Sequence, residues 1–110
     1  MPADDDTNSN TSRTENPSGS WRLVVRGELD AASAPDLQAQ LDELVEQHAQ
    51  LVIVDLAEIT FLDSSGLRAL VHGARALEKH GGRLLVENAS GAVERILELT
   101  GLLEELSGGE

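Results

Sequence analysis

Two adjacent serines, Ser64 and Ser65, are the residues of this chain best placed to take part in chemistry. They stand between Asp63 and Gly66, directly before a stretch in which apolar residues recur at helical spacing. The first N–H groups of a helix have no partner within it, and the helix dipole adds partial positive charge, so an oxyanion is tolerated there. A phosphoserine would therefore fit here. The alternative is that Ser64 or Ser65 only caps the helix, with Asp63 assisting and Gly66 allowing a tight start.

A catalytic role for either serine is not supported by the rest of the chain. A nucleophilic serine needs a general base within hydrogen-bonding distance. His72, the nearest histidine in sequence, lies about 10 to 12 Å further along the helix. The chain also lacks the Gly-x-Ser-x-Gly nucleophile elbow of hydrolases. We expect no catalytic residue and no enzymatic activity, and we expect His48, His72 and His80 to be solvated.

No sequence pattern indicates a bound nucleotide, cofactor or metal ion. No glycine-rich loop precedes Lys-Ser or Lys-Thr, and the pair Gly81-Gly82 falls at the end of a predicted helix rather than at its start. The chain has no cysteine and no set of histidines or carboxylates at ligand spacing. We therefore expect no cofactor and no metal, and any phosphoryl donor must arrive on another protein.

Charge and hydropathy limit the possible partners. The 110 residues include 8 basic and 20 acidic side chains, for a formal net charge of -12, which disfavours nucleic acid and anionic lipid as partners. The longest apolar run, residues 51–54, is far shorter than the roughly 20 residues that a membrane helix needs. The first residues lack the basic start of a secretory signal. These features predict a cytoplasmic protein without membrane insertion.

Apolar periodicity separates a tail from a folded domain. In residues 1–20, Met1 and Ala3 are the only apolar residues, so burial cannot offset the entropy lost on ordering, and we expect a disordered, acidic and polar tail. Residues 21–110 instead alternate strand and helix patterns, which predicts one α/β domain. The order favours right-handed crossovers and a mixed, mostly parallel sheet of about four strands packed with three to four helices. The expected elements are a strand from Trp21 to Gly27, a helix capped by Ser33, a central strand at 51–54, a helix after Gly66, a strand at 84–86 and a helix capped by Ser90.

Four short segments, in this order, are similar to segments of a known protein family. Over residues 21 to about 106, the chain resembles bacterial anti-sigma factor antagonists of the STAS domain family. The resemblance implies a STAS-like fold and partner switching: the unphosphorylated antagonist binds an anti-sigma factor that is also a serine kinase, phosphorylation reverses the binding, and a PP2C-type phosphatase restores the active form. The segments are Gly27-Glu28-Leu29-Asp30, Phe61-Leu62-Asp63-Ser64-Ser65-Gly66-Leu67, Gly81-Gly82 and Leu99-Thr100-Gly101-Leu102.

The resemblance also implies which residues act. Ser64, the first hydroxyl residue after Asp63, is the implied phosphorylation site, with Ser65 as the second choice. A phosphate adds about -1.5 to -2 charges, and beside Asp63 it must be desolvated or repelled within a contact patch. A tenfold loss of affinity corresponds to only about 1.4 kcal/mol. The expected partner-binding residues are Glu28, Asp30, Asp63, Ser65, Gly66 and Arg68.

Some features depart from the family pattern. Family members carry a further strand before the one at Trp21, but the stretch from Thr7 to Pro17 shows no apolar alternation, so we expect that strand to be missing or irregular. Arg68 stands where many phosphorylated antagonists have glycine. Its guanidinium is expected to point to solvent, the alternative being a pair with a phosphate. A second interpretation is a STAS scaffold in a stress-signalling complex, or a soluble accessory subunit of a lipid ABC transporter, in which the serines are structural.

Overall fold

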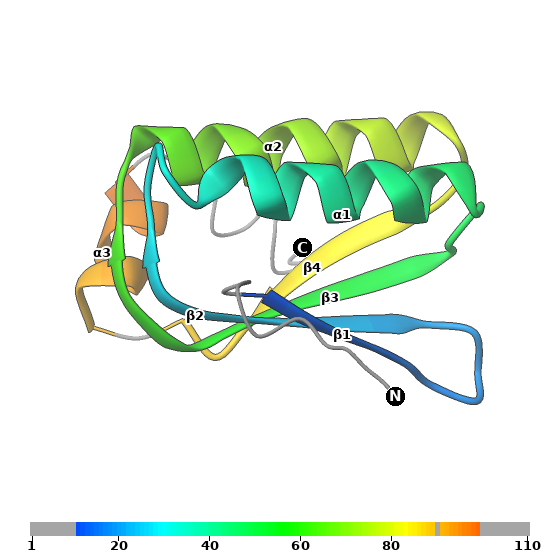
Figure 1. Cartoon of the computed structure of the whole chain (residues 1–110), viewed down its shortest axis with the longest axis horizontal. Helices are drawn as coiled ribbons and strands as arrows, with labels where there is room; N and C mark the ends of the chain where they lie inside the picture. The colour runs from blue at the N-terminus through cyan, green and yellow to red at the C-terminus, as the bar shows by residue number, and fades with distance from the viewer. Residues whose placement is uncertain (1–10, 90, 100–110) are drawn as a thin grey trace.

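The computed structural model describes residues 11–89 and 91–99 of the chain. Helices α1 and α2 lie side by side over one face of a sheet, and α3 lies at one end of that sheet (Figure 1). This architecture confirms the predicted α/β fold, with three helices in the described residues. The elements are β1 (Thr11–Glu15), β2 (Trp21–Leu29), α1 (Ala34–Glu46), β3 (Leu51–Leu62), α2 (Ser64–Lys79), β4 (Arg83–Glu87) and α3 (Gly91–Leu99).

The four strands form one mixed sheet in the order β1-β2-β3-β4. Strand β1 runs antiparallel to β2, whereas β3 runs parallel to both β2 and β4. The predicted mostly parallel sheet and the interior position of the run 51–54 are therefore confirmed. Because β2 and β3 are parallel neighbours, their carboxyl ends meet at one edge of the sheet, and α1 and α2 both begin at that edge (Figure 1).

Alternate residues of the strands point toward the helices and make an aliphatic core. This pattern follows from the period of two in a strand, and the scarcity of aromatic residues leaves leucine and valine to fill the space. Gly73 of α2 allows close packing, since a Cβ there would lie 2.5 Å from Cδ1 of Leu41 in α1. The fully buried side chains include Leu23, Val25, Leu29, Leu37, Leu41, Leu44, Val52, Val54, Leu70 and Leu97.

Residues 11–15 form strand β1, where the sequence predicts a disordered tail and a missing or irregular strand. The expectation of disorder over residues 1–20 is wrong for residues 11–20, because β1 pairs with β2 over its whole length and Thr11 is buried. The guanidinium of Arg13 lies 5.5 Å from the centre of the Trp21 ring and pairs with Glu43 of α1 at 2.8 Å. An edge strand can be held by backbone hydrogen bonds and such contacts without any apolar alternation. Residues 1–10 lie outside the described residues.

The two interior strands extend further than their apolar patterns indicate. Strand β2 continues past Gly27, which adopts φ 77°, and the pairing with β3 shifts register on both sides of this residue. Such bulges bend a strand, and both strands curve toward the helix layer at this end (Figure 1). The pairing resumes between Glu28 and Phe61 and between Leu29 and Leu62. This extension brings the ends of β2 and β3 to the first residues of α1 and α2.

The predicted third helix is present as α3. Its Val93 and Leu97 are buried against the core cluster, as their spacing suggests. The predicted cap, Ser90, lies outside the described residues, as does the segment 100–110 that completes the predicted domain.

Candidate functional site

The candidate site is the sheet edge at which two strand-to-helix connections lie next to each other. The last pair of the β2–β3 ladder is Leu29 with Leu62, and the Asp63 N–H donates to the Leu29 carbonyl oxygen at 3.2 Å. Asp30 and Asp63 therefore follow two neighbouring strands directly. The structure thus brings together two groups of predicted site residues that are more than thirty positions apart in the sequence.

Asp63, rather than either serine, caps α2. Its backbone is extended, and its Oδ1 accepts hydrogen bonds from the N–H groups of Ser65 at 2.9 Å and Gly66 at 3.2 Å. Ser64 is then the first residue of the helix and Ser65 the second. The alternative in which a serine hydroxyl caps the helix is therefore wrong: the longer aspartate side chain, from the residue before, already occupies these donors.

The two serines differ in exposure. Ser64 is exposed, whereas Ser65 is half-buried. Within the part of the chain that the structure describes, neither hydroxyl takes part in a hydrogen bond. The Ser64 hydroxyl is therefore accessible from solvent and has no structural task among these residues.

Gly66 holds the two serines at this edge by permitting a close approach of the helix. It is buried, and a Cβ at this position would lie 2.7 Å from the Leu29 Cγ, the Leu29 carbonyl oxygen and the Leu62 Cδ1. No side chain fits without moving backbone. The structure thus gives Gly66 a packing role that sets where Ser64 stands.

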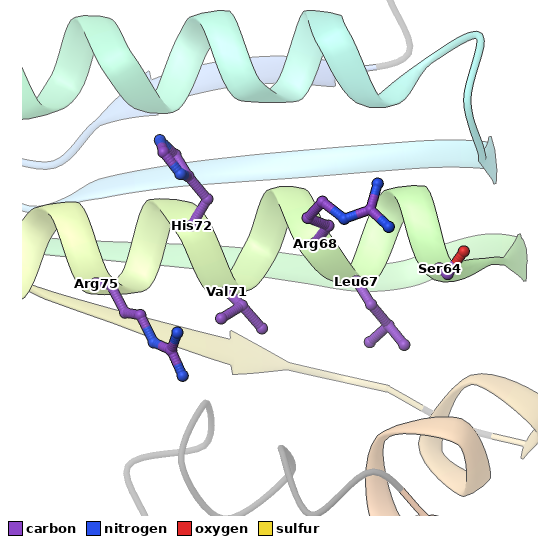
Figure 2. Close-up of a pocket in the computed structure, with 6 residues that line it drawn as sticks. All are labelled: Ser64, Leu67, Arg68, Val71, His72 and Arg75. Atoms are coloured by element: carbon purple, nitrogen blue, oxygen red, sulfur yellow. The ribbon is translucent and has the colours of Figure 1, made fainter.

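Arg68 lies between two grooves that run along α2. One groove, of about 440 Å³, contains Ser64, and the other, of about 350 Å³, contains Ser65 and borders α1. Arg68 is exposed, as expected, and no described residue pairs with it. Figure 2 shows its guanidinium directed along the helix toward Ser64. The first groove is lined by Ser64, Leu67, Arg68, Val71, His72 and Arg75, and the second by Ala31, Ala34, Pro35, Gln38, Ser65, Arg68 and Ala69.

The neighbouring connection before α1 is closed by its own hydrogen bonds. Asp30 Oδ1 accepts from the N–H groups of Ala32 at 3.0 Å and Ser33 at 3.1 Å. Ser33 stands at the predicted cap position, but its hydroxyl makes no capping bond. The hydroxyl instead donates to the Glu28 carbonyl oxygen at 2.6 Å and accepts from the Asp30 N–H at 3.0 Å. The predicted capping bond is wrong because the backbone of Ser33 is already helical, at φ -101° and ψ -21°, and turns the hydroxyl back toward β2.

Sequence reasoning missed three residues at or near this edge. Phe61 is 50% exposed and is the one large apolar side chain so exposed in the described residues. It pairs in register with Glu28. Val71 and Arg75 extend the groove of Ser64 along α2 (Figure 2). The spacing of the basic residues on α2 was a usable signal, since Arg68, His72, Arg75 and Lys79 recur every three or four positions. The exposure of Phe61 had no such signal.

In the described part of the chain, the titratable groups with shifted pKa values are Asp55 and Arg22, which do not line either groove. Burial works to raise the pKa of Asp55, but hydrogen bonds from the Ala57 N–H, the Asn88 amide and Arg22 outweigh it, and the pKa is lowered. The pKa of Arg22 is raised by hydrogen bonds to Glu87 and Asp55, at 2.9 and 3.0 Å. This network links side chains of β2, β3 and β4 and therefore has a structural role in the sheet.

Other kinds of site find no support in the described ranges, 11–89 and 91–99. His72 lines the groove of Ser64 but stands two helical turns away from it, so the two side chains do not form a nucleophile–base pair. No group of three or more histidines and carboxylates there is arranged to hold a metal ion. None of the described helices has the length and apolarity needed to cross a membrane.

Comparisons with known proteins converge on one family. The family model described as the STAS domain matches residues 13–108. The anti-sigma-B factor antagonist of Bacillus subtilis (strain 168) is 40% identical over 81 residues, which cover 74% of this chain and 73% of that protein. This chain is similar in structure to an anti-sigma factor antagonist from Mycobacterium paratuberculosis, whose crystal structure is known. The TM-score is 0.74 and the sequence identity 28%, over 88% of this chain and 80% of the antagonist. The phosphorylated form of the Bacillus cell fate determinant SpoIIAA shares the fold, with a TM-score of 0.71 and 24% identity over 84% of each chain.

Proposed function

This chain belongs to the STAS domain family, and we propose that it is an anti-sigma factor antagonist that binds an anti-sigma factor kinase and releases it when Ser64 is phosphorylated. The observation that carries the proposal is that the Ser64 hydroxyl is exposed and does not cap the helix. This serine is the first residue of α2, and Asp63 already provides the cap that a serine would otherwise supply. Ser65, half-buried beside α1, is the less accessible of the two.

The kinase is proposed to contact the edge at which β2 and β3 end. Glu28 is exposed and Asp30 and Asp63 are half-buried where these strands end. The exposed Arg68 lines the groove of Ser64, so the surface offers both signs of charge near Ser64. The exposed ring of Phe61 adds apolar area of the kind that anchors protein interfaces. Gly66 contributes through the position of the backbone. The proposed contact residues are Glu28, Asp30, Phe61, Asp63, Ser65, Gly66 and Arg68.

The sign of the switch follows from the hydrogen bonds at the start of α2. The N–H groups of Ser65 and Gly66 already donate to the Asp63 carboxylate, so they are not open to a phosphate on Ser64. The new dianion would stand next to an existing negative charge within the contact surface. Burying it against a partner requires desolvation of the phosphate, and binding weakens.

The rest of the cycle is proposed from the family. Removal of the phosphate by a PP2C-type phosphatase would restore the binding form, and the exchange would take place in the cytoplasm, where sigma factors act. No cofactor or metal ion of this chain is required, because the kinase supplies the ATP site.

The direct test is phosphorylation by the cognate anti-sigma factor kinase. Wild-type protein incubated with kinase and ATP should gain one phosphate by mass spectrometry, and Ser64→Ala should gain none. Ser65→Ala is the matched control, one residue away, and should still be phosphorylated. Stoichiometric phosphorylation of Ser64→Ala would show that the acceptor is a different residue.

Binding provides the second half of the test. Ser64→Asp should bind the kinase at least about tenfold more weakly than wild type, a loss of about 1.4 kcal/mol. Equal affinity would contradict the charge mechanism. Co-purification of the wild-type chain from its native cytoplasm should retrieve the kinase. Retrieval of transporter ATPase subunits instead would favour the accessory-subunit interpretation.

A further inference from the structure

We propose that Arg68 forms an ion pair with the phosphate on Ser64, and that this pair withdraws Arg68 from the surface offered to the kinase. The inference rests on the proposed function, in which Ser64 is the acceptor. It adds a second consequence of the modification. Phosphorylation would then add negative charge at one position and remove a positive charge from the contact surface one helical turn away.

The positions of the two side chains support the pair. Ser64 and Arg68 are four residues apart on α2, so they stand on one face of the helix, one turn apart. Both line the same groove, and the guanidinium of Arg68 extends along the helix toward Ser64 (Figure 2). Arg68 has no ion pair with any described residue, so no ion pair with these residues must be broken. A planar guanidinium can donate two parallel hydrogen bonds to phosphate oxygens.

The start of α2 also needs such a cation. A helix N-terminus ordinarily receives a phosphate through its free N–H groups. Here the N–H groups of Ser65 and Gly66 donate to the Asp63 side chain, and the Leu67 N–H donates to the Asp63 carbonyl oxygen. The Ser64 N–H is the one of these first four donors without a partner among the described residues. The phosphate would therefore find one open donor beside three occupied ones and a neighbouring carboxylate. Arg68 is the cationic side chain within one turn that can offset this repulsion.

A second arginine in the same groove provides a matched control. Arg75 also lines the groove that contains Ser64, but it stands eleven residues from Ser64, which is about 16 Å along the helix axis. Both arginines are exposed and lie on α2. Replacing either one by glutamine removes the same charge from the same groove, and only one of the two variants removes a group within reach of the phosphate.

Arg68 is also placed to act in the unphosphorylated protein. It borders both grooves, the one with Ser64 and the one between α2 and α1, so a docked partner can reach it from either side. If the phosphate holds Arg68, the contribution of Arg68 to kinase binding is lost on phosphorylation. The effects of Arg68→Gln and of phosphorylation on kinase affinity should then be less than additive.

The deciding experiment uses full-length protein with phosphoserine placed at position 64 during translation, so it does not depend on the kinase. The second pKa of the phosphate is measured by ³¹P NMR titration in the wild-type background and in Arg68→Gln, Arg68→Lys and Arg75→Gln. A nearby cation favours the dianion and lowers this pKa. We expect Arg68→Gln to raise it by about 0.2 to 0.7 pH units, Arg75→Gln to raise it by less than half as much, and Arg68→Lys to lie between wild type and Arg68→Gln.

Each outcome bears on the proposal. Asp63 and His72 are present in all four proteins, so the difference between the two glutamine variants reports the arginine alone. An unchanged phosphate pKa in Arg68→Gln, or equal shifts in both glutamine variants, would overturn the ion pair. If Arg68→Gln shifts the pKa as expected but the kinase does not phosphorylate Ser64, the pair stands and the proposed function fails. If the kinase phosphorylates Ser64 but Arg68→Gln leaves the pKa of the phosphate unchanged, the proposed function stands and the ion pair fails.

Discussion

The starts of α1 and α2 use the same residue types in opposite ways. Each follows an interior strand at the same edge of the sheet, and each has an aspartate whose Oδ1 accepts from two N–H groups. At α1 the nearby serine, Ser33, has a structural role, since its hydroxyl is hydrogen-bonded to the backbone of Glu28 and Asp30. At α2 the serine hydroxyls have no such bonds among the described residues.

This difference distinguishes a structural serine from an available one. A hydroxyl that satisfies buried or half-buried backbone groups cannot be modified without leaving those groups unpaired. Modification of the Ser64 hydroxyl leaves no such group unpaired, because Asp63 caps α2 and Gly66 packs its first turn against β2 and β3. A serine that is to be phosphorylated and dephosphorylated repeatedly should have this property.

The largest effect is expected at Gly66. Gly66→Ala places a Cβ 2.7 Å from backbone and side-chain atoms of Leu29 and Leu62, and we expect the free energy of unfolding to fall by about 1 to 3 kcal/mol in urea denaturation. Gly73→Ala is the control on the same helix. The three atoms nearest to its Cβ all belong to the side chain of Leu41, which can move more easily than backbone, so this variant should lose less stability. Stability equal to wild type in Gly66→Ala would mean that the junction is not tightly packed.

The next effect concerns the cap. Asp63→Ala removes the acceptor of two N–H groups at the start of α2, and we expect a loss of about 0.5 to 2 kcal/mol in unfolding free energy, measured by thermal or urea denaturation. Asp63→Asn keeps a capping oxygen and should retain most of this stability. An unchanged unfolding free energy in Asp63→Ala would mean that a serine hydroxyl replaces Asp63 as the cap. Ser64 would then not be available for modification.

The smallest effects separate the two serines directly. Ser33→Ala removes the hydrogen bond to the Glu28 carbonyl oxygen and should lower the unfolding free energy by about 1 kcal/mol. Ser64→Ala should change it by less than about 0.5 kcal/mol, as is usual for exposed positions. Circular dichroism melts of the two variants, run beside wild type, test the contrast. Equal losses would remove the distinction between a structural and an available serine.

Sequence reasoning located the candidate site because its signals are local. Asp63-Ser64-Ser65-Gly66 precedes a stretch whose apolar residues recur with a helical period, so the start of α2 could be placed to within three residues. The same reasoning placed Ser33 at the start of α1 but assigned its hydroxyl to the wrong partner. Capping depends on the backbone angles of the cap residue, and these are set by how β2 ends rather than by the residue type.

Other features had no local signal. Strand β1 is held by the ladder to β2 and by contacts of Arg13 with Trp21 and Glu43, none of which produces apolar alternation in residues 11–15. The extension of β3 to Leu62 depends on pairing with β2 across a bulge. The exposure of Phe61 depends on what the rest of the fold leaves uncovered.

By itself, the amino-acid sequence determined the α/β class, the order of strands and helices in residues 21–99, and the position of two serines at a helix start, because hydrophobic periodicity and turn residues act over a few neighbours. Only the tertiary structure decided that Asp63 is the cap, that Ser64 is exposed beside Arg68, and that the acidic connection after β2 stands next to them. These properties arise from contacts between segments far apart in the chain, and a side chain's exposure and hydrogen-bond partners follow from those contacts.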